Sequence, residues 1–102
     1  MELPRPPQGC TPAWHLYVIR HEQADPISRQ LSARGQGNRA YYRVPVHRQP
    51  AMAAYGTGVE LPGTERAART HLAIPMSPVL SAEQAAEVTE AVRGALRERS
   101  AA

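Results

Sequence analysis

Two polar side chains that could bind a ligand, His47 and Gln49, lie in a short run between Pro45 and Pro50. Proline fixes its own φ and pushes the preceding residue toward an extended conformation, so residues 44–50 are predicted to form an extended, irregular loop. An imidazole and a carboxamide can each donate and accept hydrogen bonds. We expect this loop to form a binding site, although His47 equally fits a structural role in which it hydrogen-bonds a backbone carbonyl.

The histidines and the cysteine do not form a metal-binding pattern. The four histidines stand at positions 15, 21, 47 and 71, without H-x₃-H spacing, and Cys10 is the only cysteine. Surface or partly buried imidazoles explain this arrangement better than a metal site, so no metal is predicted. A single cysteine cannot form an internal disulfide, and no apolar run reaches the length of a signal or membrane segment. These features predict a cytoplasmic protein with no membrane contact.

The charge pattern argues against nucleic-acid binding. All twelve cationic side chains are arginines and the net charge is +3. A nucleic-acid-binding protein usually concentrates its positive charge in a stripe with interleaved aromatic residues. Here the arginines are dispersed, at positions 5, 20, 29, 34, 39, 43, 48, 66, 69, 93, 97 and 99. No nucleic-acid partner is therefore expected.

A chain of 102 residues has room for one small domain with a thin core. Four of its ten prolines fall within residues 1–12, where no helix or strand pairing is expected, so this segment is predicted to be a disordered tail. Residues 13–99 form the predicted domain, and residues 100–102 are a second short tail. Such a small domain would gain stability from a partner surface.

The first half of the domain has a strand–helix–strand pattern. Residues 14–20 are aromatic and β-branched with apolar groups on both faces, which predicts a central strand. A helix is predicted next, with Asp25 as its N-cap and Pro26 at its first position. It is expected to end near Arg34, with Gly35 as the closing residue. Residues 38–44 have the composition of a second strand.

The second half is predicted to be helical. Thr64 is the expected N-cap of a short helix that continues to the break at Pro75. Ser81 and Gln84 have the form of a capping box, in which each side chain bonds a backbone N–H at the start of a helix. The apolar positions that follow, Ala85, Val88, Val92, Ala95 and Leu96, recur at helical spacing. The predicted fold class is α/β, a small two-layer strand-helix-strand domain.

Several spaced motifs in a fixed order resemble one enzyme family. They are the strand 14–20, the helix ending at Gly35, the run YYRVPVHRQP at 41–50, LPGTE at 61–65, IPMSP at 74–78 and the last helix. This order is similar to the carboxy-terminal region of the DegT/StrS-type sugar aminotransferases, over nearly everything after the tail. An ordered set of motifs is far more specific than one short motif.

The resemblance implies the small carboxy-terminal domain of a fold type I aminotransferase dependent on pyridoxal phosphate. That family transfers an amino group to a nucleotide-linked keto sugar during amino and deoxyamino sugar biosynthesis. Such chemistry needs a lysine to hold the cofactor as a Schiff base, and this sequence has none. Arginine cannot replace it, because its guanidinium stays protonated. The chain is therefore expected to have no catalytic or cofactor-binding residue and to be inactive alone.

By position, the resemblance assigns a substrate-binding role to Tyr41, Tyr42, His47 and Gln49, which would help form the sugar-nucleotide pocket. Alternation along a strand would instead place one tyrosine in the core and the other on the surface. Arg43 stands where the family usually has proline, and solvation at the surface is the favoured role for it. Further departures from the family pattern are Gln36, Gly63 and Ala73, which suggest relaxed constraint on the pocket.

Three interpretations remain open. In the first, the chain is a truncated or stand-alone carboxy-terminal domain of a sugar aminotransferase. In the second, it is a small subunit that docks on a separate large domain or a full-length homologue and completes or modulates the site of that partner. The third interpretation is an unrelated small basic binding protein. Phosphate-driven binding of the third kind would weaken steeply with salt.

Overall fold

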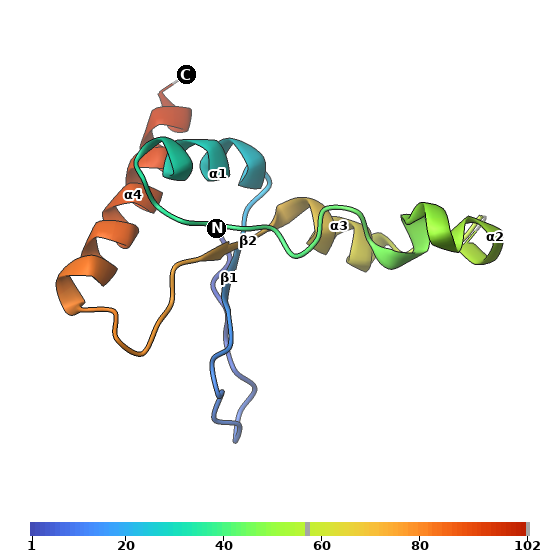
Figure 1. Cartoon of the computed structure of the whole chain (residues 1–102), viewed down its shortest axis with the longest axis horizontal. Coiled ribbons are helices and arrows are strands. Elements are labelled where there is room, and N and C mark those ends of the chain that lie inside the picture. Colours follow the sequence, from blue (N-terminus) through green and yellow to red (C-terminus); the bar gives the residue numbers. More distant parts are fainter. Residues whose placement is uncertain (57, 102) are drawn as a thin grey trace.

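The computed structural model describes residues 1–56 and 58–101, and it has a helix–sheet core from which an arm projects (Figure 1). The core contains β1 (Tyr17–Arg20), α1 (Ala24–Ala33), β2 (His71–Ile74) and α4 (Ala82–Ser100). The arm consists of the short 3₁₀ helices η1 (Val46–Arg48) and η2 (Pro50–Met52), then α2 (Ala53–Gly56) and α3 (Pro62–Thr70). The predicted α/β class is confirmed.

The sheet has two antiparallel strands, with Tyr17 of β1 opposite Ile74 of β2 and Arg20 opposite His71. The prediction of a second strand at 38–44 is wrong, since only Arg39 of this segment pairs, as an isolated bridge. The second strand is β2, whose residues were predicted to form the end of a helix. Its first three residues are all buried, so β2 lacks the alternating pattern that identifies a half-exposed strand.

The first strand is shorter than predicted and has an unexpected neighbour. Trp14 has a positive φ of 49°, and its ring stacks on Tyr17 with 5.5 Å between centroids, so β1 begins only at Tyr17. Glu2 forms a bridge with Arg20 through two backbone hydrogen bonds of 2.8 and 2.9 Å. The expectation that no residue of segment 1–12 pairs with a strand is therefore wrong at Glu2. The tail boundary itself stays a prediction.

The two ends of α1 differ in how well the sequence indicates them. Asp25 is not the N-cap, because the helix begins at Ala24 and its cap, Gln23, makes no side-chain capping bond. The closing glycine is confirmed: Gly35 has a φ of +74°. Gly35 N–H donates to Ser32 O and Gln36 N–H to Leu31 O, at 3.0 and 2.9 Å. This pair of bonds is a Schellman motif, which satisfies carbonyls that the helix leaves free.

The core lies where α1 packs against both α4 and the sheet (Figure 1). Ile27 and Leu31 of α1 are fully buried, as their spacing predicts. The buried residues of the core are Ile19, Ala24, Ile27, Leu31, Leu72, Ala91, Val92 and Ala95. Burying an aliphatic side chain contributes on the order of 1.5 to 3 kcal/mol, so these few residues supply most of the core's stability.

Local signals locate α4 better than α3. The capping box is present: Ser81 Oγ accepts from Gln84 N–H at 3.1 Å, and Gln84 Oε1 accepts from Ser81 N–H at 2.9 Å. Helix α3 begins at Pro62 rather than after Thr64 and ends before β2. Helix α4 continues to Ser100, one residue into the predicted tail at 100–102, and residue 102 lies outside the described residues.

Candidate functional site

An open cavity of about 760 Å³ lies between β1 and the arm. A volume of this size is typical of small-molecule sites, which are usually apolar with a few polar groups. Its lining residues are Leu16, Val18, Arg20, Tyr41, Tyr42, Val44, Pro45, Val46, His47, Gln49, Met52, Tyr55, Val59, Leu61, Thr64, Ala67, Ala68 and His71. The four predicted site residues thus line one cavity, although they come from two different local structures.

Tyr41 and Tyr42 form an aromatic pair on the cavity lining. Their ring centroids are 5.9 Å apart in an edge-to-face arrangement, and the Arg39 guanidinium carbon lies 5.3 Å from the Tyr41 ring centroid. Tyr41 is 40% exposed and Tyr42 is 69% exposed. The expectation that one tyrosine enters the core is wrong, because residues 40–45 form no strand. Both rings are accessible to a ligand.

His47 is held by a contact with Glu65, in the first turn of α3. Its Nε2 lies 3.1 Å from Glu65 Oε1 and its side chain is 10% exposed. The same carboxylate oxygen accepts hydrogen bonds from Arg48 Nε and Nη2 at 3.2 and 2.7 Å. The hydrogen bond from His47, followed by that from Arg48, lowers the pKa of Glu65 below its ordinary value of 4.5. An ionised carboxylate only accepts, so Nε2 of His47 carries a proton.

The proton on Nε2 leaves Nδ1 of a neutral His47 as an acceptor. Nδ1 makes no hydrogen bond to residues 1–56 or 58–101, and His47 lines the cavity. The imidazole therefore combines both roles that the sequence left open, with one nitrogen used in the fold and the other available to a ligand. Its partner in the fold is a carboxylate rather than the expected backbone carbonyl. The sequence predicted that Glu65 lies in the first turn of a helix, but not that it contacts His47.

Gln49 closes its own loop. Its Nε2 donates to Val44 O at 2.8 Å, while Arg48 N–H and Gln49 N–H donate to Pro45 O and Val46 O at 2.9 and 3.1 Å. The loop is therefore partly helical rather than wholly extended, although Pro45 and Gln49 keep extended ψ angles of 157° and 140°. Gln49 lines the cavity, but its amide nitrogen already donates a hydrogen bond within the loop.

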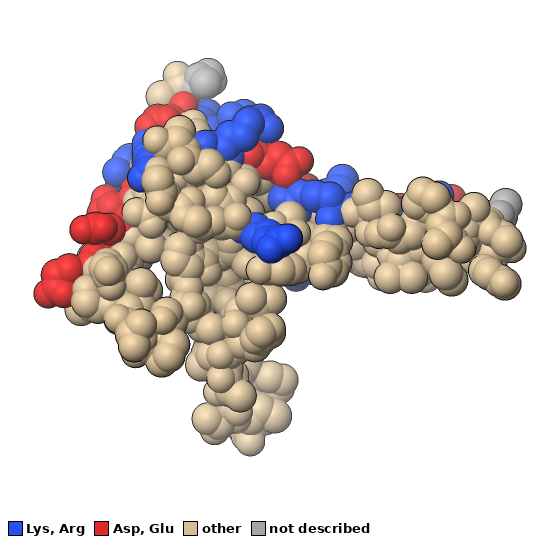
Figure 2. Space-filling model, in the orientation of Figure 1, with Lys and Arg blue, Asp and Glu red and all other residues tan. Residues whose placement is uncertain are grey.

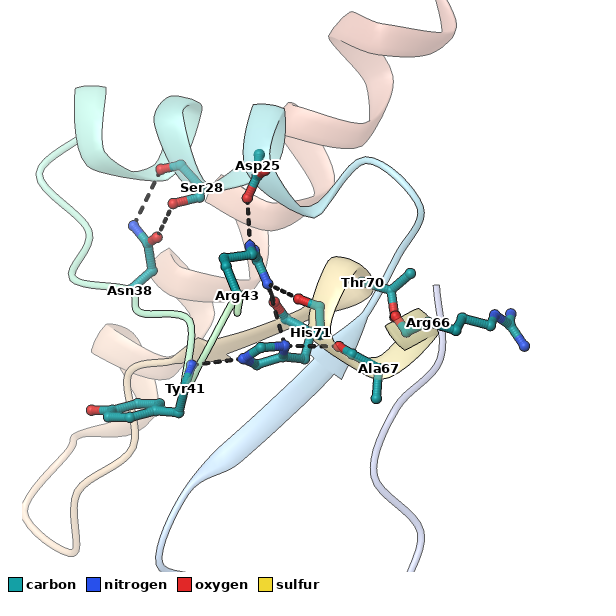
Figure 3. A network of polar contacts seen from close by, with 10 residues as sticks. Asp25, Ser28, Asn38, Tyr41, Arg43, Arg66, Ala67, Thr70 and His71 are labelled. Atoms are coloured by element: carbon teal, nitrogen blue, oxygen red, sulfur yellow. Dashed lines mark hydrogen bonds and ion pairs between the residues drawn. The ribbon is translucent and has the colours of Figure 1, made fainter. Parts of the chain in front are cut away.

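Arg43 does not have the solvated role predicted for it. Its guanidinium donates to Asp25 Oδ1, Ala68 O and His71 O at 2.7, 2.9 and 2.6 Å. Figure 3 shows Arg43 lying between Asp25 and His71. His71 is 8% exposed, and its Nε2 accepts from Tyr41 N–H at 2.6 Å. The roles of both residues could not be predicted from the sequence, because neither forms a motif and both act through contacts distant in sequence.

Charged side chains are distributed unevenly over the molecule. Figure 2 shows red and blue residues gathered over α1 and α4, whereas the arm is mostly uncharged in this view. Among the residues that the structure describes, no three His, Cys, Asp or Glu gather to hold a metal ion. Within the same residues, no helix has both the length and the apolar character needed to cross a membrane.

The comparisons with known proteins agree on one family. The model of the DegT/DnrJ/EryC1/StrS aminotransferase family matches residues 1–93. A dTDP-3-amino-3,4,6-trideoxy-alpha-D-glucose transaminase of Streptomyces venezuelae is 39% identical to the chain over 92 residues, which are 89% of this chain and 24% of that protein. The chain thus spans about a quarter of the length of this curated relative.

Solved structures show the same relationship. The crystal structure of S. venezuelae DesV in complex with a ketimine intermediate superimposes with a TM-score of 0.85 at 38% identity, covering 91% of this chain and 25% of that one. The structure of NtdA from Bacillus subtilis with bound cofactor PMP gives a TM-score of 0.71 at 26% identity, covering 82% and 20%. The chain belongs to the DegT/DnrJ/EryC1/StrS aminotransferase family.

Proposed function

We propose that this chain is the carboxy-terminal domain of a pyridoxal phosphate-dependent sugar aminotransferase, truncated or standing alone, and that it forms one side of a nucleotide-sugar site. The observation that carries this proposal is that Tyr41, Tyr42, His47 and Gln49 line a single cavity. The names of its relatives, which include a dTDP-amino-sugar transaminase, support a nucleotide sugar as the ligand class. A cytoplasmic location stays part of this proposal.

The four residues offer distinct contacts to such a ligand. The exposed faces of Tyr41 and Tyr42 suit stacking against a base or the apolar face of a sugar, and their hydroxyls can hydrogen-bond. His47 Nδ1 can accept a hydrogen bond from a sugar hydroxyl while Nε2 stays on Glu65. Gln49 can accept through its remaining amide oxygen. These groups would bind and orient the substrate, and none of them transfers the amino group.

Pyridoxal phosphate, when bound in such enzymes, supplies the electron sink for amino-group transfer. This sequence has no lysine to hold it covalently, so the residues present do not fit the cofactor by themselves. We therefore propose that the chain alone is inactive. Arg39 and Arg43 do not compensate, since a guanidinium is not a nucleophile at neutral pH.

A titration of the purified chain tests both parts of the proposal. Pyridoxal phosphate followed by absorbance should show no covalently held cofactor. Thymidine 5′-diphosphate (TDP), followed by NMR, should shift the Tyr41 and Tyr42 signals and leave those of Tyr17 unchanged. Turnover of an amino donor with a nucleotide-linked keto sugar by the chain alone would refute the proposed inactivity.

The second candidate is a small subunit that completes a separate aminotransferase. Exposed apolar side chains on and beside the arm favour it, namely Val44, Val46, Tyr55, Val59 and Leu61. Such a group on a small protein is typical of a surface that a partner covers. Mixing the chain with a separately expressed large domain of the S. venezuelae relative, followed by size-exclusion chromatography, tests this candidate. Elution of the two polypeptides as unchanged separate peaks would refute it.

A further inference from the structure

The segment that carries both tyrosines has no secondary structure of its own. Arg39 is fixed to Ala73 by a bridge of two hydrogen bonds, 2.8 and 3.0 Å long, and η1 begins at Val46. Between these two points, residues 40–45 belong to no helix or strand. Without a ladder or a helix, an exposed segment of this length would sample many conformations. Side-chain contacts must therefore hold the tyrosines at the cavity.

The imidazole of His71 supplies the first of these contacts. Its Nδ1 lies 2.8 Å from Ala67 O, and its Nε2 lies 2.6 Å from Tyr41 N. A carbonyl oxygen only accepts and a backbone N–H only donates, so Nδ1 carries the proton and Nε2 does not. One tautomer satisfies both bonds, and the ring thereby ties the backbone of Tyr41 to the last turn of α3. Figure 3 shows the Tyr41 ring extending away from this bond.

The guanidinium of Arg43 supplies the second contact, on the other side of Tyr42. It donates to Asp25 in the first turn of α1, to Ala68 O in α3 and to His71 O in β2. The last carbonyls of a helix have no partner within it, and a cation is favourable there. Nε donates to Asp25 and Nη1 to the two carbonyls, a use of two separate nitrogens that the single ammonium of lysine cannot reproduce. Arg43 therefore joins three elements to one residue of the loop.

We propose that Arg43 and His71 are positioning residues, which hold Tyr41 and Tyr42 on the lining of the cavity so that both rings are ready to contact a nucleotide sugar. The part of this proposal that concerns nucleotide-sugar binding rests on the proposed function. Tyr41 is held at its own N–H, and Tyr42 lies between two anchored residues while remaining 69% exposed. Such preorganisation lowers the conformational entropy lost on binding.

The test uses the full chain labelled with ¹⁵N, with Arg43→Gln, Arg43→Lys and His71→Phe as variants. Arg66→Gln is the matched control, because Arg66 forms ion pairs with Glu2 and Glu22 but does not line the cavity. The wild-type ¹⁵N spectrum should show His71 with its proton on Nδ1. Amide exchange of Tyr41 should be at least about tenfold faster in each of the three variants and unchanged in Arg66→Gln, at matched stability to urea.

TDP is the ligand probe in the same samples. Its dissociation constant should rise about tenfold in Arg43→Gln and Arg43→Lys and stay constant in Arg66→Gln, as expected when a preorganised site becomes mobile. If His71→Phe does not fold, the two Arg43 variants decide, because Arg43→Lys keeps the positive charge and removes only the guanidinium fork. Unchanged Tyr41 exchange in both Arg43 variants would overturn the positioning role.

The two proposals fail in different ways. If TDP moves no signal of the wild-type chain while Tyr41 exchange still depends on Arg43, the nucleotide site is refuted and the positioning role stands. If TDP binds the wild type and the Arg43 variants equally, the site stands and its dependence on Arg43 is refuted. Either result is readable without activity of an assembled enzyme.

Discussion

The carboxylate of Glu65 joins His47 and Arg48, in the loop at residues 44–50, to the first turn of α3. A carboxylate in the first turn of a helix is also favoured by the helix dipole. The loop on this side of the cavity therefore depends on one acidic side chain. This arrangement makes the site sensitive to acid, with a direction that follows from the pKa of Glu65.

Replacing Glu65 with glutamine should remove part of the acid sensitivity of folding. A carboxyl whose folded pKa is lowered stabilises the protein above its unfolded pKa, here 4.5, and that stability is lost as pH falls through the folded value. Urea unfolding followed between about pH 6 and about pH 3 should show a shallower loss in Glu65→Gln than in the wild type. Glu60→Gln, in the neighbouring loop, is the control and should keep the wild-type slope. Equal slopes in wild type and Glu65→Gln would contradict the contact.

The capping box of α4 predicts a defined loss of stability. Ser81→Ala leaves Gln84 N–H without its side-chain acceptor, and N-cap replacements of this kind cost about 1 kcal/mol. The free energy of unfolding, measured with urea, should fall by that amount. Ser100→Ala removes a hydroxyl that bonds Leu96 O at the exposed end of the same helix and should have almost no effect. A loss as large in Ser100→Ala would mean that the cap is not the cause.

The core of this small domain should tolerate cavities poorly. Leu31 of α1 is fully buried in the core, and a buried Leu→Ala replacement costs about 2 to 5 kcal/mol. We expect Leu31→Ala to unfold the chain at room temperature, as seen by the loss of dispersed NMR signals. Val79→Ala is the control, since Val79 is 88% exposed. A folded Leu31→Ala variant with wild-type dispersion would show that the core lies elsewhere.

Local chemistry in the sequence was sufficient for some elements and not for others. Ser81, Gln84 and Gly35 act through neighbours within five positions, so their caps could be predicted from residue type and spacing. Strand β2 could not, because a short buried run has the same composition in a strand and in a helix. Its assignment depends on pairing with β1, more than fifty positions away.

The site shows the same division. The proline-framed loop and the family pattern pointed to Tyr41, Tyr42, His47 and Gln49, and the structure places all four on the lining of one cavity. Their role in binding a substrate stays a prediction. No local pattern indicated that Arg43 would reach Asp25 and the end of α3, since those contacts span 18 and 25 positions. A pattern read along the chain reports which groups are available, and tertiary structure decides which of them meet.

Arg34 and Gly94 should show strong energetic coupling between α1 and α4. Arg34 Nη1 donates to Ala91 O at 2.7 Å, and a Cβ added at Gly94 would clash with that same nitrogen. Gly94→Ala must therefore displace the flexible end of Arg34, although alanine itself is favoured over glycine in a helix by about 1 kcal/mol. The two effects oppose each other, so Gly94→Ala should change the free energy of unfolding by less than about 1 kcal/mol.

The coupling appears in a double-mutant cycle. Arg34→Ala should cost about 1 to 2 kcal/mol in the wild-type background, because it removes a charge-assisted hydrogen bond, and much less in the Gly94→Ala background. Arg93→Ala, which removes an exposed pair with Glu90 on the same helix, should cost the same in both backgrounds. Additive effects of Arg34→Ala and Gly94→Ala would contradict the observed contact.

The exposed apolar residues near the arm should bind an apolar probe. Val46 and Tyr55 are 70% and 79% exposed and line the same cavity, so the fluorescence of 1-anilinonaphthalene-8-sulfonate should rise when the folded chain is added. The double variant Val46→Ser/Tyr55→Ser should reduce this rise by about half or more, because it removes two of the largest accessible apolar surfaces. Val79→Ser is the control, since Val79 is 88% exposed but does not line the cavity. An equal decrease in Val79→Ser would show that the probe reports general surface exposure and not the cavity beside the arm.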